Sequence, residues 1–292
     1  MSVKKTFAQI PLKTSLFLES LFAGDYKTHF AGKGMEFEKF VPYEFGKSAK
    51  NIDFSRSSNL FTPLEKVYTE ERQLDVYLML DMNMSEKKGF LYEQKNNLIF
   101  SLIDILGRSI FASHNRMGGY IFENKVYFSP KKTLTSLECF MEVLALTPSG
   151  RGEYKIPLNP PLLKGEEIEK KIITRPYHTL KLRKKMIFYI TSSCECMDRI
   201  KELSYENDVR VIHVFHHFEN TLEGSGIFPL GKKEKILYID LNDHKKKEQY
   251  KKLRQEKIHS FKKQVMSLGL KYIYLDTQSD MYQTLFESSS QS

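Results

Sequence analysis

The chain has 292 residues, of which 41% are hydrophobic and 28% are charged. This composition is typical of a folded protein and excludes a disordered chain, and the length allows one large domain or a domain with a smaller module. The formal net charge of +9 allows a nucleic acid or an anionic membrane surface as partner, but it is also typical of lysine-rich helices whose faces are solvated.

Three further properties bear on location. No apolar run approaches the roughly 18 residues that a membrane-spanning helix needs, and the longest runs, such as Val76–Leu80, have the length of a strand. Basic residues near the start are not followed by an apolar stretch, so we expect no signal peptide. The three cysteines are an odd and sparse set, which argues against a disulfide framework, and no second pair exists beside Cys194 and Cys196 to complete a zinc site. We therefore expect a cytoplasmic protein without a membrane span.

Residues 1–72 are predicted to form a separate, irregular and β-rich N-terminal module. A short helix is expected over Pro11–Phe22, because leucine and phenylalanine recur there at helical spacing. From Gly24 to Tyr68 glycines punctuate segments rich in β-forming residues, which predicts short strands and turns.

The pattern changes at Leu74. Leu74–Leu80 is mostly apolar on both faces, as in a parallel strand covered by helices on both sides. A polar loop, Asp81–Ser85, follows it. The next predicted elements, from apolar periodicity, are a helix, two short strands and a second helix: Tyr92–Ser113, Gly118–Phe122, Lys125–Phe128 and Leu134–Leu146.

Ser149–Gly165 is predicted to be a loop, because prolines and glycines are too dense there for a helix or strand. The remaining prediction is four helices and four strands, with the first three strands buried. The helices are Glu166–Ile173, Met197–Glu206, Lys245–Leu268 and Met281–Phe286, and the strands are Met186–Ile190, Val209–Phe215, Lys235–Asp240 and Tyr272–Leu275. On the long helix, the apolar side is expected to include Tyr250, Leu253, Phe261, Val265 and Leu268.

Strands thus alternate with helices over residues 73–288. This order predicts an α/β fold with a mostly parallel sheet and helices on both faces. In such sheets ligands bind at the carboxyl ends of the strands. Three polar loops qualify by position: Asp81–Ser85, Thr147–Gly150 and Thr191–Ser193.

Several short motifs in the first 72 residues stand in a fixed order. They are a Gly-x-Gly-x-Glu-Phe segment, a Tyr-Glu-Phe-Gly segment, an Ile-Asp-Phe segment and a Glu-Glu-Arg segment, and their residues are Gly32, Gly34, Glu36, Phe37, Tyr43, Gly46, Ile52, Asp53, Glu71 and Arg72. This order resembles the bacterial family called domain of unknown function 58, in which such a block precedes a von Willebrand factor A-like domain. The chain departs from the family pattern at Lys47, Lys50 and Phe54, where that family has Asp, Arg and Trp.

The resemblance implies a Rossmann-like von Willebrand A domain over 73–288, with 1–72 as a family-specific module. Members of the family are often encoded beside MoxR-type AAA+ ATPases, which implies work with such an ATPase in protein assembly or remodelling. No catalytic residues are established for the family, so none can be carried over, and we expect a protein-binding function without catalysis.

The Asp81-x-Asn83-x-Ser85 segment resembles the start of a metal-ion-dependent adhesion site. Such a site binds Mg²⁺, which requires about six oxygen ligands. Thr147 or Ser149 would supply the ligand from a second loop, but Thr191–Ser193 occupies the place of the acidic third loop. We expect a degenerate site at Asp81, Asn83, Ser85 and Thr147 with weak affinity for Mg²⁺. The alternative is that Asp81 only accepts hydrogen bonds in a strand-to-helix turn.

Other chemistry is less well supported. Glu36 and Asp53 with Lys66 could serve a metal-dependent hydrolase, although pairing with Arg56 or Arg72 is the simpler interpretation. His213, His216 and His217 have poor spacing for shared metal ligation in an extended chain and are expected to be structural. The sequence contains no Gly-x-x-x-x-Gly-Lys-Ser/Thr loop and no Gly-x-Ser-x-Gly motif.

The sequence therefore predicts a non-enzymatic scaffold whose binding face is the Asp81 end of the sheet. The rival hypothesis is a nucleic-acid-binding protein that uses the basic helix over residues 245–268.

Overall fold

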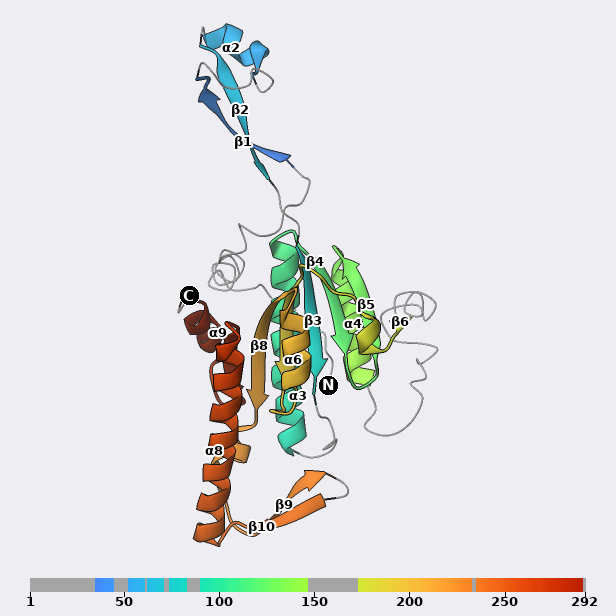
Figure 1. Ribbon diagram of the computed structural model, residues 1–292, viewed down its shortest axis with the longest axis vertical. Coiled ribbons are helices and arrows are strands. Elements are labelled where there is room, and N and C mark those ends of the chain that lie inside the picture. The colour runs from blue at the N-terminus through green and yellow to red at the C-terminus, as the bar shows by residue number, and fades with distance from the viewer. Residues whose placement is uncertain are drawn as a thin grey trace. The chain divides into compact units, whose positions relative to one another are not determined.

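The computed structural model describes residues 35–44, 52–60, 62–70, 74–82, 90–146, 173–232 and 235–290. The chain divides into two compact units (Figure 1). One unit spans residues 25–73, and the other contains all described residues from Leu74 onward. None of the helices in the described ranges is long and apolar enough to cross a membrane.

The unit over 25–73 contains an antiparallel hairpin of β1 (Met35–Pro42) and β2 (Leu64–Glu70). The short helix α2 (Phe54–Leu60) lies between them in sequence. The two strands confirm the prediction of β structure here, whereas α2 was not predicted, because its serines and asparagine are weak helix formers. The helix predicted over Pro11–Phe22 lies outside the described residues.

The larger unit is built on a seven-stranded sheet of order β11-β8-β7-β3-β4-β5-β6. Five neighbouring strands are parallel, and β5 and β6 are antiparallel. The strands are β3 (Asp75–Asp81), β4 (Arg116–Ile121), β5 (Val126–Lys131), β6 (Ile173–Thr174), β7 (Met186–Thr191), β8 (Asp208–Phe215) and β11 (Lys271–Asp276). The predicted mostly parallel α/β sheet is thereby confirmed, and the architecture is Rossmann-like. Ile173, predicted to end a helix, begins β6 instead.

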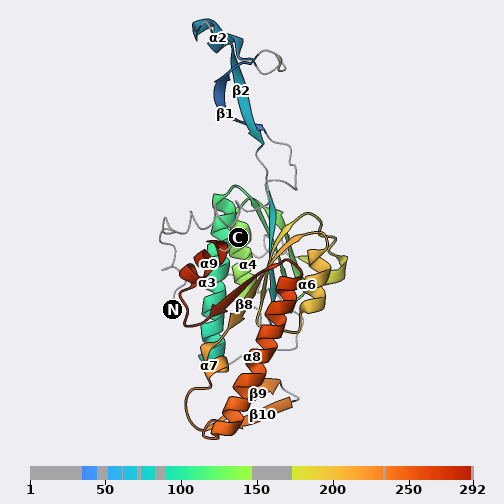
Figure 2. The ribbon, with the colours of Figure 1, turned by 60° about the vertical axis from the view of Figure 1, so that its left-hand side comes forward.

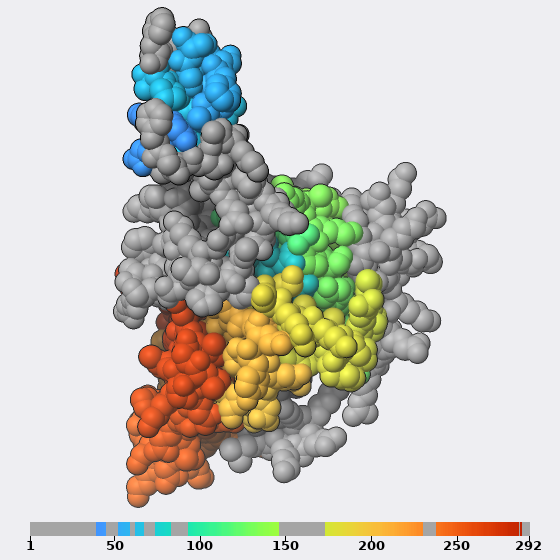
Figure 3. Space-filling model, turned by 45° about the horizontal axis from the view of Figure 1, so that its top comes forward, coloured from blue at the N-terminus to red at the C-terminus, as the bar shows by residue number. Residues whose placement is uncertain are grey.

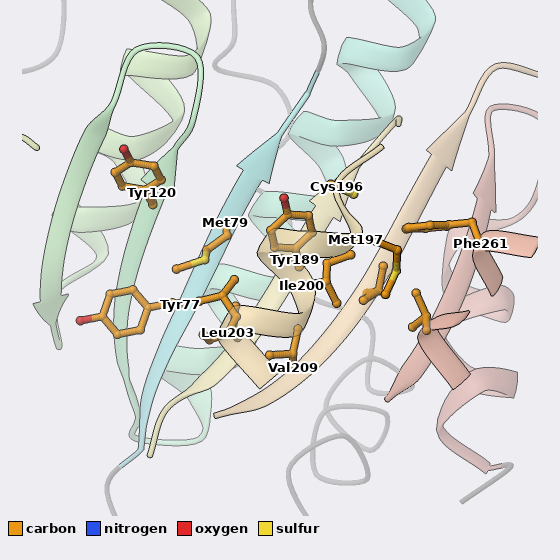
Figure 4. Close-up of a cluster of buried hydrophobic side chains, with 13 residues drawn as sticks. Tyr77, Met79, Tyr120, Tyr189, Cys196, Met197, Ile200, Leu203, Val209 and Phe261 are labelled. Carbon is orange, nitrogen blue, oxygen red and sulfur yellow. The ribbon is translucent and has the colours of Figure 1, made fainter. Parts of the chain in front are cut away.

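Helices cover both faces of this sheet (Figure 2). The helices α3 (Phe90–Ala112) and α4 (Leu134–Leu146) pack on one face, while α6 (Met197–Ser204) and α8 (His244–Ser267) pack on the other. A last helix, α9 (Met281–Ser290), contacts β11. Because alternate residues of a strand point to opposite faces, Tyr77 and Met79 of β3 join the core beneath α6 and α8 (Figure 4).

One predicted strand lies elsewhere than expected. Lys235–Asp240 is strand β10, and it pairs with β9 (Ile227–Lys232) in a separate hairpin rather than extending the central sheet. This hairpin follows β8 and the short helix α7 (His217–Thr221). It has a small apolar cluster of its own around Leu222, Ile239 and Leu241.

The hairpin also explains why the apolar side of α8 was only partly predicted. Phe261 and Val265 in the second half of the helix are buried against the sheet, as expected. Leu253, in contrast, is 67% exposed, and Leu268 is 40% exposed. The first half of α8 reaches past the sheet and runs beside β10 and α7, which accounts for the exposure of Leu253 (Figure 1). Leu268 is the C-cap at the other end of the helix, so this explanation does not extend to it.

Candidate functional site at the carboxyl ends of the strands

The order of the central sheet reverses at β3. The chain passes from β3 to β4 and β5 on one side, and it then returns to place β7, β8 and β11 on the other side. The helix after β3 covers one face and the helix after β7 covers the opposite face (Figure 2). In doubly wound sheets ligands bind beyond the carboxyl ends of the strands at such a reversal. The fold therefore makes the carboxyl ends of β3 and β7 the candidate binding position.

Asp81, the last residue of β3, lies at this position. Its Oδ2 accepts a hydrogen bond from the hydroxyl of Tyr189 on β7. The same oxygen lies 2.6 Å from Nη1 of Arg199 on α6. Thr191 is the register partner of Asp81, and its Oγ1 donates to the Asp81 carbonyl oxygen at 3.0 Å. Two of the three predicted loops are therefore brought together, those that begin at Asp81 and at Thr191.

Tyr189 connects the site to the core. Its ring is fully buried between the sheet and α6, and its hydroxyl points toward the carboxyl ends of the strands (Figure 4). Burial, and next the charge of Asp81, raise the pKa of Tyr189 far above its ordinary value. The hydroxyl consequently stays protonated at every physiological pH, so it remains a hydrogen-bond donor that fixes the Asp81 carboxylate.

Arg199 is the exposed member of this group. It lies in the first turn of α6, and its guanidinium is stacked over the Phe122 ring at 4.9 Å from the centroid. The side chain of Arg199 is 48% exposed, whereas that of Asp81 is 15% exposed. A cation in the first turn of a helix is disfavoured by the helix dipole, so the Asp81 carboxylate compensates an otherwise unfavourable placement.

The loop after β7 is held by bonds within itself. The Ser193 backbone N–H donates to Thr191 Oγ1 at 3.0 Å, and the Glu195 backbone N–H donates to Ser193 Oγ at 3.1 Å. Cys196 is buried, and burial raises the pKa of its thiol to about 11. At neutral pH this thiol is protonated, so it is a packing residue and not a thiolate nucleophile.

A second cysteine approaches a histidine nearby. Cys194 Sγ lies 4.0 Å from Nε2 of His213, whose Nδ1 is 2.9 Å from the Tyr272 hydroxyl. Burial, and next the charge of Arg254, lower the pKa of His213 to about 3, while burial raises the pKa of Cys194. Both groups are therefore neutral at pH 7, unlike the thiolate–imidazolium pair of cysteine-dependent hydrolases.

The remaining histidines also have structural contacts. His216 caps α7 by accepting from the Phe218 backbone N–H at 3.1 Å, and its other ring nitrogen lies 2.7 Å from Oε1 of Gln94. His217 lies 3.4 Å from Asp276. These contacts agree with the predicted structural role, although the two residues begin a helix and do not continue an extended strand.

The predicted family-motif residues fall in the smaller unit. Glu36 and Phe37 lie on β1, opposite Thr69 and Tyr68 of β2. The others among the described residues are Tyr43, which follows β1, Ile52, which bridges to Glu65, and Asp53. Gly32, Gly34, Gly46, Glu71 and Arg72 lie outside the described residues.

Asp53 has a structural explanation. It caps α2 by accepting from the Arg56 backbone N–H at 3.1 Å, and its carboxylate lies 3.0 Å from the Lys66 ammonium. The hydrogen bond from Lys66, and next that from Arg56, lower the pKa of Asp53. Asp53 and Lys66, two of the three residues of the hydrolase hypothesis, are therefore in contact, whereas the side chain of Glu36 lies outside the described residues.

The described part of the strand-end site does not fit a divalent cation. The Asp81 carboxylate already faces a guanidinium, which balances its charge. Over the described ranges, no three His, Cys, Asp or Glu side chains are grouped so that they could hold a metal ion. Mg²⁺ needs about six oxygen ligands. The three other predicted ligands, Asn83, Ser85 and Thr147, lie outside the described residues, so the Mg²⁺ prediction stays untested for them.

Sequence reasoning missed Tyr189 and Arg199. Tyr189 was counted only as part of a buried strand, because nothing local indicates that its hydroxyl meets a carboxylate 108 positions away. Arg199 carried a detectable signal, since a basic residue in the first turn of a helix opposes the helix dipole and requires an anionic neighbour.

Comparison with known proteins gave one match. The comparisons with curated proteins and with solved structures found no match. The model of the family described as "Protein of unknown function DUF58" matches residues 40–259, which include most of the smaller unit's described residues and the strand-end site. The match covers about three quarters of the chain, and the chain therefore belongs to the DUF58 family.

Proposed function

We propose that this protein is a non-enzymatic scaffold with a von Willebrand A-like domain, and that it binds a protein partner at the carboxyl ends of β3 and β7. The observation that carries the proposal is the position of the Asp81, Tyr189 and Arg199 cluster at the reversal of strand order. The neutral states of Cys194, Cys196 and His213 count against thiol-based catalysis at this end of the sheet.

The partner that we propose is a MoxR-type AAA+ ATPase, with assembly or remodelling of other proteins as the shared task. Support for this choice is the family membership together with the resemblance described above. A von Willebrand A-like identity is supported by the mostly parallel sheet with helices on both faces.

Affinity purification from the native cells, read by mass spectrometry, tests the proposal. Tagged wild-type protein and an Arg183→Gln control are expected to enrich an AAA+ ATPase, and Asp81→Ala is expected to lose it. Arg183 is a suitable control because it is an exposed, ion-paired arginine just before β7, at the opposite end of the sheet. Circular dichroism would establish that each variant is folded. If wild-type protein enriches no ATPase, the proposed partner is wrong, and if Asp81→Ala retains it, the interface lies elsewhere.

A second candidate function is nucleic-acid binding by α8. This helix contains eight lysines and one arginine against two glutamates. Lys245, Lys246 and Lys252 are exposed, and α8 lies beside α6 on one face of the molecule (Figure 3). Several of its basic residues are, however, engaged in ion pairs, such as Arg254 with Glu219 at 2.5 Å and Lys257 with Glu195 at 3.1 Å.

An electrophoretic mobility shift assay at two salt concentrations distinguishes this candidate. Binding through phosphate contacts weakens steeply with salt, and each neutralised lysine reduces the slope. Replacing Lys245, Lys246 and Lys252 by glutamine should then abolish the shift, and absence of a shift for wild-type protein at low salt would exclude the candidate.

A further inference from the structure

The cation that pairs with Asp81 is a side chain of this protein and not a metal ion. The guanidinium of Arg199 contacts the carboxylate at 2.6 Å, and Asp81 is the first residue of the predicted metal site. We infer that Arg199 is the built-in cation of this face and that it binds a carboxylate of the protein partner directly, without a divalent metal.

Two contacts fix the guanidinium in place. Asp81 accepts from Nη1, and the Phe122 ring lies beneath the guanidinium plane. Phe122 is in turn packed against Tyr177, with ring centroids 5.0 Å apart, and against Tyr189, at 5.7 Å. An arginine held by a carboxylate and an aromatic face loses little conformational freedom when it binds a further anion.

The guanidinium can serve a second acceptor. It carries five N–H donors in a planar fork, and Asp81 accepts from one of them in the contacts described above. Nearly half of the Arg199 side chain is exposed, at 48%. A partner carboxylate is the matching group, because its two oxygens fit the spacing of the fork.

The charge balance favours this arrangement over a metal. The Asp81 carboxylate is already paired with the Arg199 guanidinium, so it attracts Mg²⁺ less than an unpaired carboxylate would. A metal would first have to displace the guanidinium. Removing the guanidinium should therefore increase the affinity of the site for a divalent cation.

Binding of Mn²⁺ to the full chain tests the metal part, with free Mn²⁺ measured by electron paramagnetic resonance. We expect no Asp81-dependent Mn²⁺ binding by wild-type protein or by the Arg183→Gln control. Arg199→Gln should bind Mn²⁺ at least tenfold more tightly than wild-type protein, and the double variant with Asp81→Asn should lose this gain. Wild-type binding that Asp81→Asn removes would overturn the inference, and so would an Arg199→Gln variant that gains nothing.

The carboxylate part rests on the proposed function, and it is tested with a random peptide library displayed on phage. Selection in EDTA on wild-type protein should enrich peptides that contain Asp or Glu, and Arg199→Gln should not enrich them. Arg199→Lys keeps the charge but not the planar fork, so it should retain the selected peptides only weakly. Equal enrichment on wild-type protein and Arg199→Gln would overturn this part. If acidic peptides are selected but no ATPase is captured from cells, the inference stands and the proposed partner is wrong.

Discussion

The two ends of β3 both carry an aspartate paired to a cation, yet they differ in how that pair is built. At the amino end, Asp75 contacts Arg116 at 2.6 Å and Lys185 at 2.5 Å, and its side chain is 7% exposed. Arg116 is its register partner on β4, and Lys185 immediately precedes β7. At the carboxyl end, Asp81 pairs with a single cation, Arg199, whose half-exposed side chain lies on helix α6.

The same kind of ion pair is placed to stabilise the fold at one end of β3 and to bind a partner at the other. At the amino end, one cation lies on β4 and the other directly precedes β7, so the pairs tie three adjacent strands together. At the carboxyl end, the cation is displayed on α6 and can exchange its contacts without moving a strand. We therefore expect changes at Asp75 to affect stability and changes at Arg199 to affect recognition.

The largest expected effect is that of Asp75→Ala. Removing a buried carboxylate leaves two cations without their anion, which costs about 3 kcal/mol of unfolding free energy. The value is at the low end of the usual range because Arg116 and Lys185 can both reach solvent. Urea unfolding at pH 7 measures it. Asp104→Ala, which breaks a helical pair with Arg108, is the control and should cost about 0.5 kcal/mol. Equal losses in the two variants would contradict the structural role of Asp75.

The next effect is acid destabilisation through His213, which lies in β8 opposite Thr191 at the carboxyl end of the sheet. Because burial lowers the pKa of His213 to about 3 in the folded state, the unfolded chain takes up a proton first as the pH falls below the ordinary value near 6.5. The contribution of His213 to the free energy of unfolding is fully present above that value. It is lost as the pH falls toward 3, on the order of 2 kcal/mol between pH 7 and pH 4.5.

Urea unfolding at these two pH values checks this, with His213→Phe as the comparison. The variant should show a smaller difference between the two pH values than wild-type protein. An identical difference would mean that other groups dominate the acid response.

Tyr189→Phe should have a smaller effect, about 1.5 kcal/mol at pH 7, because it removes a hydrogen bond to a charged group. The pKa of Tyr189 is raised in the folded state by burial first and by Asp81 second. Its contribution is therefore complete below the ordinary tyrosine value of about 10 and is lost above it, since only the unfolded chain ionises there. Thermal unfolding at pH 7 and pH 10.5 should show a weaker alkaline loss for the variant than for wild-type protein.

The smallest effect on stability is expected for Arg199→Gln, below about 1 kcal/mol, because exposed ion pairs contribute little. Arg183→Gln should cost a similar amount. Only Arg199→Gln should lose the acidic peptides selected on wild-type protein. A loss of several kcal/mol in Arg199→Gln, seen in urea unfolding, would remove the contrast between the two ends of β3.

The strands of the sheet could be predicted because burial on both faces leaves a continuous apolar run, as in Met186–Ile190. The hairpin of β9 and β10 could not be predicted, because Pro229 and Gly231 within β9 are typical of a loop. The contact between Asp81 and Arg199 joins residues 118 positions apart, and no local pattern encodes such a pair. Asp81 itself was predicted, because its place after a buried strand follows from chain order alone.

The pairing of β11 with β8 has a consequence for synthesis on the ribosome. Lys271 of β11 pairs with Arg210 of β8, which is 61 positions earlier (271 minus 210), and the hairpin and α8 lie between them. At a synthesis rate of about 5–20 residues per second, roughly 3–12 seconds pass between the synthesis of Arg210 on β8 and that of Lys271 on β11. During that interval its outer edge is an open template for other strands. The nascent chain is therefore most vulnerable to misassembly just before its last strand is made.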